Sequence, residues 1–250
     1  MIWVVTAAGG IAFATFVGSV IGYFFRNISQ RSYDAVIGFS SGIMLCAAVF
    51  GLIEPAISSG NAKSALTVTA GIAAGAVFLC VVDKVVPDIN KSVGIVAENE
   101  QGRVLLLVSA IAIHHFPEGI AAGVSFGNGD ASEIILVCTG IAIQNIPESA
   151  IIIAPLLNAG AKKSKAILIA LISGGVEIIG TFLGYFAINT AKAVMPFALA
   201  FAGGSMLYII IDEMIPQTHT HSNGVIASYS SLAGFCVMLG LDALIGGLLS

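Results

Sequence analysis

Long apolar stretches separated by short polar segments run along the whole chain, and this pattern predicts membrane-spanning helices. Each stretch is close to the about 20 apolar residues that a helix needs to cross a bilayer. Eight spans are predicted, joined by short segments except between Asp88 and Gly102. In order, they run Ile2 to Phe25, Tyr33 to Ile57, Ala65 to Pro87, Arg103 to Phe126, Ser132 to Leu157, Ser164 to Ile188, Ala193 to Ile215 and Val225 to Leu248. We therefore expect an all-α integral membrane protein, with residues 1–250 forming a single polytopic transmembrane domain.

An internal repeat relates the two ends of the chain. The first span contains Gly9-Gly10 and then Thr15-Phe16-Val17-Gly18, and the sixth contains Gly174-Gly175 and then Thr181-Phe182-Leu183-Gly184. The second and seventh spans share a shorter match around Gly42 and Gly204. Because an odd number of spans separates the copies, they cross the membrane in opposite directions, as in the inverted repeats of secondary transporters. Spans 1–3 and 6–8 are thus predicted to flank a central pair, spans 4 and 5.

Composition agrees with a membrane location and narrows the classes of partner. Only 10% of the residues are charged, against about a quarter in soluble proteins. The net charge of -4 comes with no basic patch, so nucleic acid is not expected as a partner. The partners expected are the lipid bilayer and whatever the protein transports or binds within it.

The basic residues predict how the chain is oriented. Eight of the ten flank predicted connections on one side of the membrane, and only Lys63 and Lys192 fall on the other side. The eight are Arg26, Arg31, Lys84, Lys91, Arg103, Lys162, Lys163 and Lys165. Because basic residues concentrate in cytoplasmic connections, both termini are expected outside the cytoplasm.

The central pair of spans carries one polar motif twice. His114-His115-Phe116-Pro117-Glu118 in the fourth span aligns with Gln144-Asn145-Ile146-Pro147-Glu148 in the fifth, thirty residues later. In a helix, the first polar residue of each copy lies four positions before its glutamate and the second lies three before it, so all share one face. The proline inside each copy is expected to bend its helix beside the polar groups.

Two such faces turned toward each other would place imidazole, carboxamide and carboxylate groups together, a mixture that suits zinc, cadmium, iron or manganese. Glu177 in the sixth span adds a carboxylate with no basic residue near it in the sequence. An unpaired carboxylate in lipid is costly, and a metal shared with the central cluster would offset that cost.

The paired Pro-Glu motifs, the glutamate of the sixth span and eight spans with outside termini resemble the ZIP family of divalent metal transporters. Within this family, Gln144 indicates a resemblance to the GufA-like bacterial branch. The resemblance implies a homodimer and a two-metal centre halfway through the membrane. One metal position would use His114, Glu118, Gln144 and Glu148, and the other His115, Asn145 and Glu177, with Glu118 and Glu148 bridging the two.

The second position departs from the family pattern. His115 stands where relatives often have Asn, and Asn145 stands where bacterial relatives can have Asp. A carboxylate is lost and an imidazole gained, so this position is open to a metal, a proton or a passing ion.

The function expected is import of a divalent cation, zinc first among the candidates, into the cytoplasm by alternating access. The metal is substrate rather than cofactor, no enzymatic activity is expected, and the lack of sorting signals favours a prokaryotic plasma membrane. His219 and His221 would lie in a short cytoplasmic loop, where they either receive departing metal or form an ordinary exposed loop.

Two other classes of protein are alternatives to a transporter. An intramembrane metallohydrolase would also bury His and Glu, although the His-Glu-x-x-His string of such proteases does not occur here. A proton-conducting or sensory membrane protein would bind metal only as a regulator.

Overall fold

The computed structural model describes residues 1–24, 28–58, 62–92, 115–127, 129–158, 162–190, 194–219 and 223–249. All regular structure in these ranges is helical. The elements are α1 (Ile2–Phe24), α2 (Gln30–Cys46), η1 (Ala47–Ile53), α3 (Glu54–Ser58), α4 (Ala62–Ser92), helical residues 115–124, η2 (Ser125–Gly127), α6 (Ala131–Asn158), α7 (Lys163–Thr190), α8 (Met195–Ile209), η4 (Ile210–Met214), α9 (Ile215–His219) and α10 (Gly224–Leu249).

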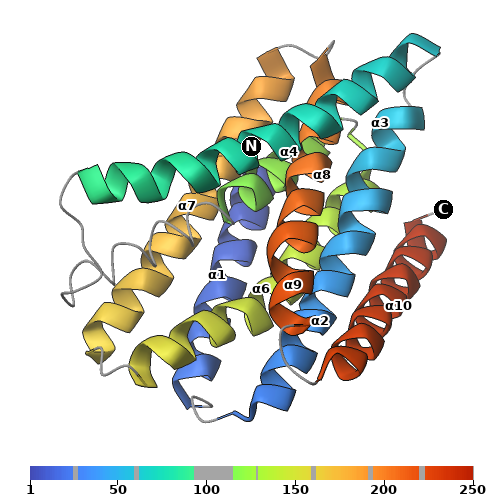
Figure 1. The fold of residues 1–250 in the computed structure, drawn as a ribbon. Helices are drawn as coiled ribbons and strands as arrows, with labels where there is room; N and C mark the ends of the chain where they lie inside the picture. The colour runs from blue at the N-terminus through green and yellow to red at the C-terminus, as the bar shows by residue number, and fades with distance from the viewer. Residues whose placement is uncertain are drawn as a thin grey trace.

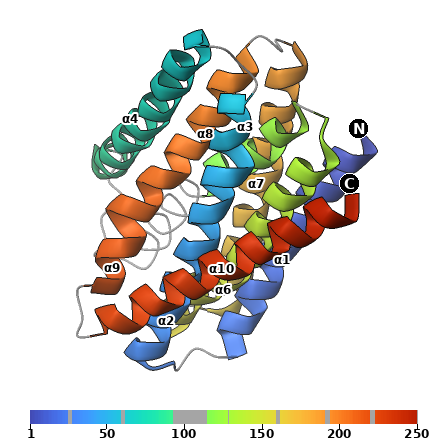
Figure 2. The same ribbon diagram turned by 90° about the vertical axis from the view of Figure 1, so that its right-hand side faces the viewer.

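The predicted all-helical membrane architecture is confirmed at this level. In the described part of the chain, six helices or runs of joined helices are long and apolar enough to cross a membrane. They are Ile2–Phe24, Gln30–Ser58, Ala65–Val85, Lys163–Ile188, Met195–His219 and Gly224–Ile245. Figures 1 and 2 show the two ends of the chain toward the same end of the helix bundle.

Glycines set how closely the helices approach one another. A Cβ placed on Gly42 of α2 would overlap the main chain of α10 at Ser231, and one on Gly75 of α4 would overlap α8. Gly18 of α1 meets α6 in the same way, and Gly123 in the helical residues 115–124 meets α7. Such close contact of main chains is the packing mode of small residues in lipid. Four tight helix pairs result, and α10 lies against α2 while α4 lies against α8 (Figures 1 and 2).

Two spans are interrupted by π-helical turns just before a proline. The π segment η1 ends two residues before Pro55, and η4 ends two residues before Pro216. Proline offers no N–H and its ring crowds the preceding turn, so a wider turn at this point relieves the clash. The bends that the sequence predicts at Pro117 and Pro147 stay predictions. The structure is helical through both prolines, and α6 is α-helical on either side of Pro147.

The helices extend further than two of the predicted spans. The α4 helix continues to Ser92, so residues 88–92, expected in the long loop, are helical. The seventh span continues through α9 to His219 rather than ending at Ile215. Hydropathy marks only the part of a helix inside hydrocarbon, whereas main-chain hydrogen bonds continue the helix through polar residues beyond it.

Candidate metal-transport site

Four helical segments bring buried polar side chains together inside the bundle. The close approach of Gly119 to α7 helps to bring them together. A Cβ on Gly119 would lie only 3.1 Å from the Cα of Glu177. This approach lets a side chain from α7 reach those from residues 115–124. The cluster consists of Thr15 from α1, His115 and Glu118 from residues 115–124, Gln144, Asn145 and Glu148 from α6, and Glu177 from α7.

Glu177 is the most heavily hydrogen-bonded member of the cluster. The hydroxyl of Thr15 lies 2.8 Å from each of its carboxylate oxygens. The amide Nδ2 of Asn145 donates to Oε1 at 2.6 Å and also to the Thr15 hydroxyl at 3.0 Å. His115 contacts the same Oε1 through Nδ1. All four side chains are fully buried, so both carboxylate oxygens of Glu177 are already engaged.

The contact with Glu177 fixes which nitrogen of His115 carries the proton. While Glu177 is ionised its carboxylate can only accept, so Nδ1 is then the N–H donor. In the neutral imidazole Nε2 then keeps its lone pair, and it has no hydrogen-bond partner among the described residues. A histidine that ligates a metal through one nitrogen commonly donates from the other to a carboxylate in this way.

Among the described residues, Glu118 is hydrogen-bonded through one carboxylate oxygen only. Its Oε1 accepts a hydrogen bond of 2.7 Å from the amide Nε2 of Gln144. Its Oε2 lies 3.6 Å from Nδ1 of His115 and accepts no hydrogen bond from the described residues. Ligand atoms of His115, Glu118 and Glu177 all lie within 4.8 Å of one another, close enough to hold one ion.

Further acceptor atoms in the cluster share this lack of donors. Within the described part of the chain, five buried atoms of its side chains have no hydrogen-bond partner: Nε2 of His115, Oε2 of Glu118, Oε1 of Gln144, Oδ1 of Asn145 and Oε2 of Glu148. Each unsatisfied buried polar atom costs about 1–3 kcal/mol. Five lone-pair atoms without a donor are the arrangement that a bound cation would satisfy.

The charge of the cluster also calls for a cation. Glu118 and Glu177 are fully buried and Glu148 is half-buried. Among the described residues His115 is the only basic side chain in ion-pair contact with Glu118 or Glu177. Buried carboxylates need a counter-charge or a proton, and a divalent ion supplies the charge in one step.

The structure brings together most of the residues that the sequence singled out. His115, Asn145 and Glu177, assigned to one metal position, form one hydrogen-bonded group, and Glu118 joins Gln144 of the other position. His114 lies outside the described residues. Which of these side chains bind metal directly stays a prediction.

Thr15 is the member that sequence reasoning missed. The repeat had paired Thr15 with Thr181, but only Thr15 reaches the cluster, since the hydroxyl of Thr181 donates to the carbonyl of Glu177 in its own helix. A hydroxyl in an apolar span was the one available signal.

His219 is not part of an exposed loop, so that expectation is corrected. It is the last residue of α9, where Nδ1 contacts the carbonyl of Ile215 at 2.9 Å and Nε2 contacts the hydroxyl of Ser228 at 3.2 Å. Its ring joins the end of the seventh span to α10. His221 lies outside the described residues.

A helical membrane protein whose buried ionisable side chains meet between its spans has the architecture of a transporter of ions. The chain belongs to the ZIP family: the family model described as ZIP zinc transporter matches residues 90–242. It is 33% identical over 88% of its length to the zinc transporter GufA of Myxococcus xanthus, covering 90% of that protein. Zinc transporter ZIPB of Bordetella bronchiseptica is 32% identical over 97% of this chain and 81% of its own, and human zinc transporter ZIP11 is 26% identical over 93% and 94%.

Membership of this family confirms the predicted resemblance, including that to the GufA-like branch. It also makes the protein a transporter rather than an enzyme, as predicted. The metallohydrolase alternative is thereby excluded.

Proposed function

We propose that this protein carries Zn²⁺ across a membrane through the buried cluster between α1, residues 115–124, α6 and α7. The observation that carries the proposal is the set of five buried acceptor atoms, beside paired carboxylates, that receive no hydrogen bond from the part of the chain that the structure describes. Imidazole nitrogen, carboxylate oxygen and amide oxygen suit zinc as ligands. Cadmium, iron and manganese would compete for the same ligand atoms. The relatives named as zinc transporters support zinc as the first substrate.

Within the cluster we assign two kinds of role. Glu118, Glu148 and Nε2 of His115 offer the strong ligand atoms, and the amide oxygens of Gln144 and Asn145 offer weaker ones. Glu177 and Thr15 position His115 and Asn145, because the oxygens of Glu177 are occupied by those groups. His114 would complete a first metal position and His115 with Asn145 a second, so that Glu118 and Glu148 stand between the two positions.

Transport requires that the ion be held strongly enough to leave water yet weakly enough to be released. The carboxylates of Glu118 and Glu148 supply the first condition. The neutral Asn145 in place of a carboxylate supplies the second, since it lowers the negative charge at one position. We therefore assign to Asn145 the role of weakening metal binding enough for release.

The helix packing supports an inverted repeat of spans 1–3 and 6–8 around a central pair, spans 4 and 5. The first span packs on the fifth through Gly18, and the sixth packs on the fourth through Gly180. The second span packs on the eighth through Gly42, and the seventh packs on the third through Gly204. Each contact of one half has a counterpart in the other, as eight spans in two inverted halves require. Alternating access by rocking of such halves around a central site is the mechanism that we infer.

The charge pattern supports one orientation in the membrane. Both termini face away from the cytoplasm, the single transporter domain lies in a prokaryotic plasma membrane, and metal moves inward. Eight of ten basic residues on one side support this orientation. The family resemblance supports a homodimer.

Zinc flux into proteoliposomes tests the proposal. Glu118→Ala and Glu148→Ala should each abolish initial uptake, because the stripped site leaves the cation's lost hydration uncompensated. Asp242→Ala, on α10 and away from the cluster, is the matched loss of a carboxylate and should transport like the parent. A protein that binds zinc but moves none would be a sensor or a metal-regulated proton conductor. Folded Glu118→Ala and Glu148→Ala variants with parental uptake would refute the site.

A further inference from the structure

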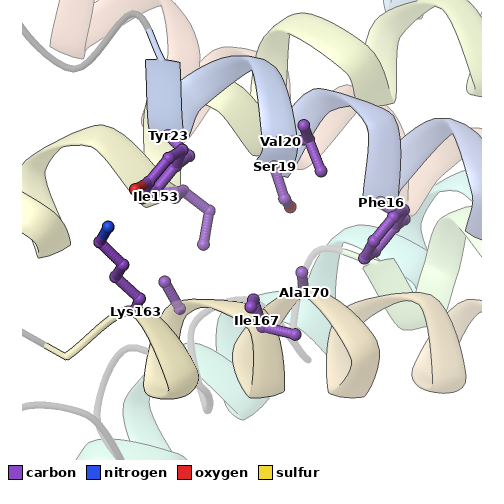
Figure 3. Close-up of a pocket in the computed structure, with 9 residues that line it drawn as sticks. Phe16, Ser19, Val20, Tyr23, Ile153, Lys163, Ile167 and Ala170 are labelled. Carbon is purple, nitrogen blue, oxygen red and sulfur yellow. The ribbon is translucent and has the colours of Figure 1, made fainter.

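A groove of about 270 Å³ lies between α1, α6 and α7, apart from the buried cluster. Figure 3 shows its two long walls, with Phe16, Val20 and Tyr23 on α1 facing Lys163 and Ile167 on α7. Ile153 of α6 contributes to the lining. Apart from Lys163, a serine hydroxyl and the phenol of Tyr23, the lining is apolar.

The groove opens toward the lipid rather than into the protein. Phe16, Val20 and Ile167 are 37%, 40% and 54% exposed, which in a membrane means exposed to hydrocarbon. From Phe16 to Tyr23 the groove follows α1 for roughly 10 Å at about 1.5 Å per residue. That length fits part of one acyl chain within a leaflet of about 15 Å.

A positive charge stands at one end of this apolar groove. Lys163 is the first residue of α7, and its Nζ lies 5.2 Å from the ring centroid of Tyr23. The cation–π contact holds the ammonium at the groove's end, while its N–H donors stay available to an anion. Lys162 precedes it and is exposed. An apolar groove ending at a fixed ammonium matches an acyl chain attached to a phosphate.

We propose that this groove binds an anionic phospholipid, with one acyl chain between α1 and α7 and the headgroup phosphate at Lys163. The apolar walls do not select among lipids, because any acyl chain fills them equally well. Selection comes from the charge, and one lysine near an anionic headgroup is worth about fivefold in binding, or about 1 kcal/mol.

Native mass spectrometry of the purified full-length protein tests the site. The protein in detergent is titrated with phosphatidylglycerol or phosphatidylcholine of the same chain length. Parent protein should retain phosphatidylglycerol about fivefold better. Lys163→Gln should lose this preference. Lys84→Gln is the matched control, since it removes an exposed lysine from α4, which does not border the groove, and it should keep the preference.

A second variant tests whether the acyl chain lies in the groove, and a second probe tests whether the phosphate must belong to a lipid. Ile167→Trp fills the groove with Lys163 intact and should lower retention of both lipids. Glycerol phosphate, which carries the headgroup charge without chains, should not bind. Near-parental melting temperatures identify the variants that remain folded.

Three results would overturn the proposal: equal retention of the two lipids by the parent, equal loss of preference in Lys163→Gln and Lys84→Gln, or unchanged retention in a folded Ile167→Trp. Either of the first two would mean that Lys163 only extends its ammonium to the membrane surface, and the third would mean that no acyl chain lies in the groove. Binding of glycerol phosphate as tight as that of the lipid would assign the site to a free phosphate instead.

Discussion

Within the buried cluster, side chains of one chemical type take different parts because their hydrogen bonds differ. Glu177 has both oxygens engaged by Thr15, and one of them also by Asn145 and His115. Glu118 has one oxygen engaged, and its other oxygen has no hydrogen-bond partner in the described ranges. A carboxylate already surrounded by donors orients its neighbours, whereas one with an open lone pair can take a metal.

Thr15 tests this division of roles. Thr15→Val keeps the shape but removes the hydroxyl that donates to Glu177 and accepts from Asn145. A hydrogen bond to a charged group is worth about 1.5–3 kcal/mol, so zinc affinity should fall by at least about tenfold. Thr15→Ser keeps the hydroxyl and should stay near the parent. Calorimetric zinc titration of the purified proteins measures the difference, and equal affinities for Thr15→Val and the parent would assign Thr15 to packing alone.

Asn145→Asp should make the thermal stability of the protein depend more strongly on zinc. Without metal, the new carboxylate would face Glu177 at the place where Nδ2 now donates at 2.6 Å. Loss of that donor costs about 1–3 kcal/mol, and repulsion between the two carboxylates adds to it. Zinc would then bind more strongly, so the melting temperature should be lower than the parent's in chelator and rise further on zinc addition.

Asn145→Ala separates the two causes. It loses the donor without adding charge, so its metal-free melting temperature should also fall, while its rise with zinc should not exceed the parent's. Zinc uptake by this variant should be reduced only in part. A rise as large as that of Asn145→Asp would show that charge at this position is unimportant.

Much of the cluster was predictable from the sequence because helical spacing alone puts residues three and four apart on one face. That rule united His115 with Glu118 and Asn145 with Glu148. It could not pair side chains between helices. The contacts of Thr15 and Asn145 with Glu177 depend on how α1, α6 and α7 pack, and a threonine in an apolar span resembles any other small packing residue.

At the scale of helices, the position of a glycine, rather than the number of glycines, decides where two helices pack closely. Gly18 and Gly10 occupy the same helix, α1. A Cβ on Gly18 would overlap the main chain of α6 at Ile146, whereas no described residue lies within 4 Å of a Cβ on Gly10. The sequence showed many glycines in apolar runs but not which of them face a neighbour. The π segments before Pro55 and Pro216 were likewise unpredicted, since most helix prolines are accommodated without one.

Gly18→Ala and Gly10→Ala form a matched pair in one helix. The methyl group on Gly18 must push α6 away, and overpacking of this kind costs about 1–3 kcal/mol. At about 2–4 °C for each kcal/mol, the melting temperature should fall by several degrees. Gly10→Ala should be neutral or slightly stabilising, because alanine is the better helix former. Equal melting temperatures would mean that α1 and α6 are less closely packed than the overlap at Gly18 requires.

At the scale of the whole molecule, the spans were predictable because hydrocarbon thickness fixes their length. The α1 and α7 helices begin and end within two residues of the predicted spans. Their pairing was not predictable in the same way. Hydropathy says that a helix is in lipid but not which neighbour it contacts, and the repeat linked equivalent spans without showing that the first packs on the fifth and the sixth on the fourth.

Orientation in the membrane is the property on which the direction of transport depends. In the proposed orientation, with both termini outside the cytoplasm, the segment before α6 would face outward and the segment before α7 inward. Ala131 and Lys162 are exposed residues at these two places. The two positions therefore report opposite sides of the bilayer.

Cysteine labelling of intact cells measures this orientation, in a background whose four native cysteines are replaced by serine. An impermeant thiol reagent should modify Ala131→Cys directly and Lys162→Cys only after the membrane is permeabilised. Labelling of both after permeabilisation is the control for reactivity. The reverse pattern in intact cells would place the lysine-rich connections outside, against the charge rule, and would turn the proposed import of zinc into export.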